Sequence, residues 1–239
     1  MASPESRITN HESRNTHHGS RKAFTLIELL IVIGIMAILA SLIFPVTRAV
    51  NQNKIRAASR TQLVNYVADI ENYKSKFGHY PPDNPGNPMV NQLYYELSGT
   101  TLDDKGAMYT TLDKACTINV NQFSTVFGPN VGGFVNSVKG SGGEEGPVAV
   151  NFLKGIKAGN WAEYKPGPTI RLLVGPVDLP SSMPGLLPAD TTFTKIPWQY
   201  ISSNPTNNPG GFDLWLDVLI GGKTNRICNW SRTVLVNPK

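Results

Sequence analysis

Residues 21–46 have the sequence RKAFTLIELLIVIGIMAILASLIFPV, in which two basic residues precede an apolar run that holds one acidic side chain, Glu28. The run is about 22 residues long, enough to cross the roughly 30 Å hydrocarbon core of a bilayer, and it predicts a transmembrane helix over 24–46. A secretory signal peptide would have a shorter apolar core and a cleavage site beyond it. Glu28 needs a partner, because a carboxylate in a membrane span is costly and usually functional.

The stretch AFTLIELLIV, residues 23–32, resembles the processing and methylation segment of type IV pilins and type II secretion pseudopilins. In that family a prepilin peptidase removes a basic leader and N-methylates the new terminus. The resemblance implies cleavage between Ala23 and Phe24. It also implies that Glu28 neutralises the terminal amine of Phe24 in a neighbouring subunit during assembly. The family usually has Gly where this chain has Ala23, and the small side chain still fits.

The rest of the chain divides into a helical extension and a head. Apolar residues continue at three- and four-residue steps over 47–77, which predicts an amphipathic extension of the anchor helix. Gly78 and the Pro81-Pro82 pair predict its end. The expected order is a cleaved leader (1–23), a transmembrane helix (24–46), the extension (47–77) and a periplasmic globular head (78–239). Arg21 and Lys22 favour a cytoplasmic leader, but the basic residues from Arg48 onward compete with them. The resemblance decides the orientation, because the family's peptidase works at the cytoplasmic face, and it implies a single-pass inner-membrane protein.

The head is expected to combine short helices with C-terminal strands. Helices are predicted at about 88–98 and 147–157, and strands at 169–174, 198–202, 212–220 and 226–236, separated by Pro, Gly and Asn turns. The expected fold class is α+β: a pilin-like fold in which the long N-terminal helix packs on a C-terminal antiparallel sheet.

The Gly78-His79-Tyr80-Pro81 step and the tryptophans of the C-terminal strands resemble the major, G-type pseudopilins of type II secretion. In that family an acidic loop between the last strands often holds calcium. Here the loop 220–226 has no carboxylate, whereas calcium takes six to eight oxygen ligands. Asp213 and Asp217 alone are insufficient, so we expect neither calcium nor another cofactor.

The cysteines, the charge and the missing motifs exclude several classes of function. Cys116 and Cys228 are too far apart for a zinc knuckle or a C-x-x-C motif; one disulfide and two free thiols both remain open. The net charge is +5, but many basic residues lie in the leader or soon after the apolar run and most of the others are scattered, so no nucleic-acid partner is expected. Beyond the leader His79 is the only histidine, and no nucleophile or phosphate-loop motif is present, so the chain is expected to be a substrate and not an enzyme.

Three functions remain after these exclusions. The first is a structural subunit of a periplasmic pseudopilus for type II secretion, with other pseudopilin subunits, the prepilin peptidase, an inner-membrane assembly platform and membrane lipid as partners. The second is a type IV pilin for adhesion, motility or DNA uptake. The third is a membrane-tethered module that binds carbohydrate or protein through the region 99–195.

Overall fold

The computed structural model describes residues 24–129, 131–140, 148–165, 169–178 and 195–238, without the side chains of 42–47. It divides into two compact units, Met1–Thr47 and Arg48–Lys239. Helix α1 (Leu26–Phe77) contributes to both. It ends where predicted, because Gly78 has a φ of +81° and its N–H donates to the carbonyl oxygen of Lys74 at 2.8 Å.

Within the second unit, one face of α1 is part of the hydrophobic core. Leu63, Tyr66, Ile70 and Tyr73 follow one another at helical spacing and are all buried, whereas Val64 between them is exposed. This is the amphipathic pattern predicted for the extension. The helix therefore forms one wall of the head, and most of its stability there comes from tertiary packing.

The other elements found among the described residues of the head are two short α-helices, two 3-10 turns and three small sheets. In chain order they are α2 (Leu93–Ser98), β1 (Thr100–Leu102), β2 (Met108–Thr111), β3 (Thr117–Asn119), η1 (Val120–Gln122), α3 (Phe123–Phe127), β4 (Ser137–Lys139), η2 (Ala158–Asn160), β5 (Trp161–Tyr164), β6 (Ile170–Asp178), β7 (Lys195–Pro197), β8 (Gln199–Ile201), β9 (Asp213–Ile220), β10 (Lys223–Cys228) and β11 (Leu235–Val236). The strand orders are β3-β2-β1-β4, β5-β6-β7 and β11-β10-β9-β8. All pairings are antiparallel except that of β1 with β4. The predicted α+β class is confirmed, and the layout is consistent with a pilin-like fold.

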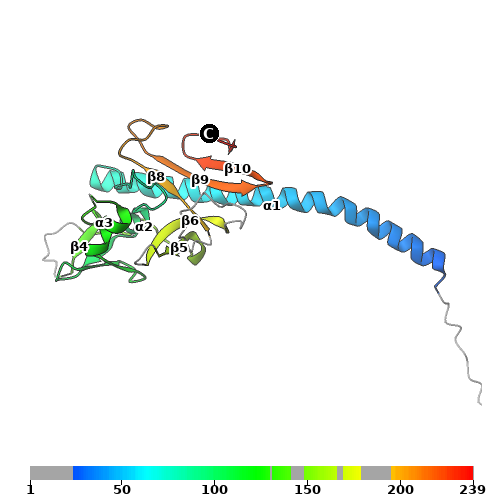
Figure 1. Ribbon diagram of the computed structural model, residues 1–239, viewed down its shortest axis with the longest axis horizontal. Coiled ribbons are helices and arrows are strands. Elements are labelled where there is room, and N and C mark those ends of the chain that lie inside the picture. Colours follow the sequence, from blue (N-terminus) through cyan, green and yellow to red (C-terminus); the bar gives the residue numbers. More distant parts are fainter. Residues whose placement is uncertain (1–23, 130, 141–147, 166–168, 179–194, 239) are drawn as a thin grey trace, which may run out of the picture. The chain divides into compact units, whose positions relative to one another are not determined.

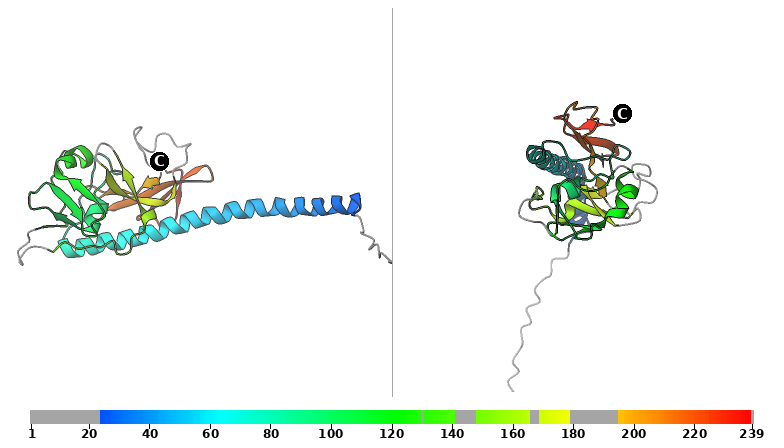
Figure 2. Two further views of the ribbon diagram at one scale, coloured as in Figure 1. Left: turned by 90° about the horizontal axis from the view of Figure 1, so that it is seen from below. Right: turned by 90° about the vertical axis from the view of Figure 1, so that its left-hand side faces the viewer.

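The C-terminal sheet packs against the head portion of α1 (Figures 1 and 2). The ring of Trp198, next to β8, meets Tyr66 of α1 edge-on, with centroids 5.8 Å apart. The guanidinium group of Arg60 donates to the carbonyl oxygens of Cys228 and Ser231, at 3.1 and 2.8 Å. An aromatic contact and charge-assisted hydrogen bonds thus stabilise the packing of the C-terminal sheet on α1.

Strands β9 and β10 form a tight hairpin. Ile220 pairs with Lys223, so only Gly221 and Gly222 lie in the turn, with φ values of +61° and +76°. A two-residue turn with both residues at positive φ suits the right-handed twist of a hairpin, and glycine adopts it without strain.

The structure differs from several of the elements predicted for the head. The helix expected at 88–98 begins only at Leu93, because the Asn91 amide donates to the carbonyl oxygens of Pro88 and Trp198 and holds residues 88–91 in a turn. The strand expected over 226–236 is split into β10, which already begins at Lys223 inside the expected loop 220–226, and β11. The described part of 147–157 contains no helix, because the N–H and C=O of Val150 both bond to the side chain of Asn136.

Candidate functional site

The first turn of α1 is closed by reciprocal hydrogen bonds between Thr25 and Glu28. The Thr25 N–H and hydroxyl group donate to Glu28 Oε2 at 2.9 and 2.8 Å, and the Glu28 N–H donates to Thr25 Oγ1 at 3.3 Å. This is a capping box, which satisfies donors that a helix start leaves unpaired. Sequence reasoning missed it, although the Thr-x-x-Glu spacing is its usual signature. Glu28 therefore has a partner within its own chain.

The capping box leaves part of the carboxylate free. Glu28 Oε1 accepts no hydrogen bond from the residues that the structure describes, and the side chain is exposed. Phe24, the other residue expected to act in assembly, lies just before the helix and is 77% exposed. Ala23, on the far side of the expected cleavage point, lies outside the described residues.

The described apolar side chains of the first unit are exposed. Every described residue over 24–41 is exposed, including Leu26 at 81% and Ile27 at 66%. Contiguous apolar surface of this kind marks a site that contacts lipid or other protein chains. The whole of this segment is therefore available as a contact surface.

None of the helices in the described part of the chain is long and apolar enough to cross a membrane. Residues 42–46 of the expected transmembrane helix have side chains outside the described set.

The turn after α1 is held by the C-terminal half of the chain. The ring of Tyr80 packs edge-on against Phe212, with centroids 5.0 Å apart. The carbonyl oxygen of Pro81 accepts hydrogen bonds from the hydroxyl groups of Tyr200 and Ser202, at 2.9 and 2.8 Å. The Gly-His-Tyr-Pro step thus fixes the direction in which the chain leaves α1.

The two aspartates considered for calcium are already bound by donors of the protein. Asp213 is buried and accepts hydrogen bonds from the N–H and side-chain amide of Asn207 and from the N–H of Asn208, at 2.9 to 3.0 Å. Asp217 is buried and forms a bidentate pair with the guanidinium of Arg226, with both N···O distances at 2.8 Å. The described residues contain no group of three or more His, Cys, Asp or Glu side chains that could hold a metal ion.

This arrangement predicts a fold that does not depend on calcium. Binding to the native state alone would stabilise it by about 2.7 kcal/mol at a hundred times Kd. Melting the full chain in detergent, first with a chelator and then with millimolar calcium, should give nearly equal midpoints. A rise of several degrees with calcium would contradict the expectation and would implicate Asp213 or Asp217.

Cys116 and Cys228, which were considered for a disulfide, are both free cysteines in the structure. Cys116 lies 3.4 Å from the hydroxyl oxygen of Tyr95, and Cys228 is fully buried at the end of β10. Burial raises the pKa of each thiol. Both groups are therefore protonated at neutral pH and are poor nucleophiles.

Residues 19–44 match a known family motif, the prokaryotic N-terminal methylation motif. The match supports a type IV pilin-like chain that a prepilin peptidase processes and that assembles with other pilin subunits. It spans the Ala23–Phe24 junction, the capping box and most of the exposed apolar surface. Curated proteins and solved structures gave no match.

Proposed function

We propose that the chain is a structural subunit of a filament, and that this filament is the pseudopilus of a type II secretion system. One observation carries the proposal: the methylation motif over 19–44 runs into a helix whose apolar side chains are exposed throughout 24–41. Before assembly, membrane lipid covers this surface over the span 24–46, with the head in the periplasm. After assembly, the same surface packs against neighbouring subunits.

The charges at the start of α1 supply the assembly chemistry. Cleavage before Phe24 creates a terminal ammonium group, and Glu28 Oε1 accepts no hydrogen bond from the described residues. Between packed apolar helices the effective dielectric constant is low, so an amine and a carboxylate of neighbouring subunits attract each other strongly. Either charge is energetically costly if it is left unpaired between the helices. Only subunits that pack in the correct register pair the two charges, so the pair favours that register.

The choice of type II secretion over a type IV pilus rests on the Gly78–Pro81 step and on the tryptophan pattern of the C-terminal strands. Neighbouring genes test this choice. A secretion ATPase and an outer-membrane secretin beside the gene would support the pseudopilus, with the inner-membrane assembly platform as a further partner. A retraction ATPase would instead support a type IV pilus, and an isolated gene would favour a tethered binding module.

Processing is the direct test of the subunit function. Intact mass of the membrane-extracted protein should show loss of residues 1–23 and one added methyl group on Phe24, because the motif directs both reactions. Ala23→Gly should be processed at least as fast, and Ala23→Leu should block cleavage by enlarging the side chain at the cut. Recovery of only the full-length chain alongside an active prepilin peptidase would refute the proposal.

A further inference from the structure

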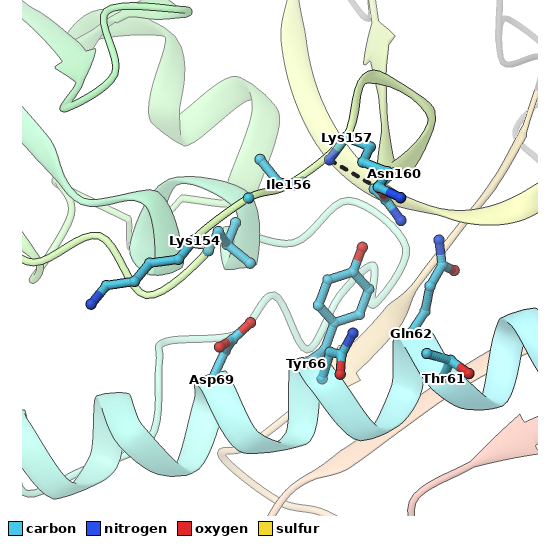
Figure 3. Close-up of a pocket in the computed structure, with 11 residues that line it drawn as sticks. Thr61, Gln62, Tyr66, Asp69, Lys154, Ile156, Lys157 and Asn160 are labelled. Carbon is cyan, nitrogen blue, oxygen red and sulfur yellow. Dashed lines mark hydrogen bonds between the residues drawn. The ribbon is translucent and has the colours of Figure 1, made fainter.

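A pocket of about 250 Å³ lies in the head between α1 and the segment 153–160 (Figure 3). Helix α1 contributes polar side chains to it, including Gln62, Tyr66 and Asp69, and the facing segment adds Asn160 and two lysines. A second hollow shares Asn65, Asp69 and Lys154 with the first and extends along the same face of the helix. The pocket has the volume of about eight water molecules, below the range for drug-sized ligands.

Asp69 is the least satisfied group in the pocket. It is half-buried and forms no hydrogen bond or ion pair with the residues that the structure describes. Burial raises its pKa to about 6. Removing a carboxylate from water costs free energy, and no hydrogen bond among the described residues offsets that cost at Asp69. An ionisable group of this kind in a cleft is a candidate for contact with a ligand.

Other polar groups around Asp69 are also incompletely bonded. The buried hydroxyl group of Tyr66 points toward Asn160 (Figure 3) but completes no hydrogen bond within the described residues. Asn151 Oδ1, in the second hollow, is likewise buried without a partner in the described part of the chain. The carbonyl oxygen of the Gln62 side chain accepts from Trp198 Nε1 at 3.3 Å, which leaves the Gln62 amino group for the pocket.

The mixture of groups limits the chemistry of the ligand. An anion would meet the Asp69 carboxylate, and a cation would meet Lys154 and Lys157 at the rim. A hydroxyl group both donates and accepts, so a small neutral molecule with several hydroxyl groups can satisfy donors and acceptors together. Leu153 and Ile156 add apolar wall for the carbon skeleton.

We propose that this pocket binds one neutral sugar residue, with the Asp69 carboxylate accepting hydrogen bonds from its hydroxyl groups and with Tyr66, Asn160 and Gln62 orienting the ring. The site is a further function of the head and does not require the filament proposed above. A chain that failed to be processed would leave this inference intact.

Saturation-transfer NMR on the full-length chain tests the site directly. The chain is solubilised in a detergent without a sugar headgroup, and the probes are glucose, galactose, mannose and N-acetylglucosamine, each at millimolar concentration. At least one probe should receive saturation. Asp69→Ala should weaken its binding about tenfold, the loss expected for a charge-assisted hydrogen bond.

The matched control is Glu71→Gln, which removes a carboxylate two residues farther along α1 and outside the pocket. It should bind the same sugar as the unmodified chain does. Unchanged tryptophan emission would show that each variant is folded, and Asn160→Ala provides a second variant if Asp69→Ala unfolds. Saturation of none of the four sugars, or equal binding by both pocket variants, would overturn the proposal.

The pH dependence of binding and the use of charged probes distinguish a neutral sugar from other classes of ligand. Tyr66, Lys154 and Lys157 line the pocket together with Asp69, and burial raises the pKa of Asp69 to about 6. Sugar affinity should therefore fall on acidification in the unmodified chain and stay level in Asp69→Asn. Preferential binding of arginine or of inorganic phosphate would refute the assignment to a neutral sugar.

Discussion

Filament yield is expected to fall by more than about tenfold in Glu28→Ala, while membrane insertion and cleavage persist. Loss of the carboxylate leaves the terminal amine of the neighbouring Phe24 unpaired between packed helices, at a cost of about 3–5 kcal/mol. Insertion should become easier, because a charge is removed from the span. Sheared-filament yield, normalised to the membrane pool of processed subunit, is the measurement.

Two variants distinguish the charge of Glu28 from its capping role. Glu28→Gln keeps the capping box with Thr25, since glutamine serves at this position, but removes the charge. Thr25→Ala removes the cap and keeps the carboxylate, at a cost of about 1 kcal/mol in helix stability. We expect Glu28→Gln to fail in assembly as Glu28→Ala does, and Thr25→Ala to assemble. The reverse pattern would make Glu28 a helix cap and not an assembly residue.

Glu96→Ala is expected to lower the free energy of unfolding of the head by about 3–5 kcal/mol, a large part of the stability of a domain. Glu96 is fully buried in α2. Its carboxylate accepts hydrogen bonds from the N–H groups of Val135 and Asn136 and from the Tyr73 hydroxyl group, at 2.8 to 3.0 Å. Alanine would leave these three donors, two of them in buried hydrogen bonds, without an acceptor.

Tyr73→Phe is the matched control, because it removes one of the three hydrogen bonds and should cost only about 1–2 kcal/mol. Chemical denaturation of the full chain in detergent, followed by tryptophan emission, measures both variants, since Trp198 is buried in the same core. A loss below about 1 kcal/mol in Glu96→Ala would show that water replaces the carboxylate.

The same carboxyl group gives the head a pH dependence of known sign. Burial is the largest influence on Glu96 and raises its pKa above that of an exposed glutamate. The folded chain then holds the proton more tightly than the unfolded chain does. Raising the pH from below the pKa of an exposed glutamate to above the raised pKa of Glu96 should therefore lower the unfolding free energy of the unmodified chain relative to that of Glu96→Gln.

Elements whose cause lies within a few neighbouring residues were predicted well from sequence. The end of α1 depends on Gly78 and the prolines after it, and it was predicted correctly. The two-residue turn between β9 and β10 is equally local, but it was predicted as a longer loop over 220–226. The processing junction and Glu28 lie in one short motif. The capping box was equally local, and it was missed only because the carboxylate was assigned wholly to a neighbouring subunit.

Features that depend on contacts between residues far apart in the sequence could not be predicted from local sequence. The sheet β1–β4 and the missing helix at 148–157 depend on Asn136, whose amide bonds to the backbone oxygens of Glu96 and Val150. Likewise the pocket at Asp69 is set by how the segment 153–160 packs on α1. Local sequence determined the methylation motif, the end of α1 and the class of fold, because turn and helix signals act over one or two turns of chain. The tertiary structure alone decided which buried polar groups find partners, since each such partner comes from another part of the chain.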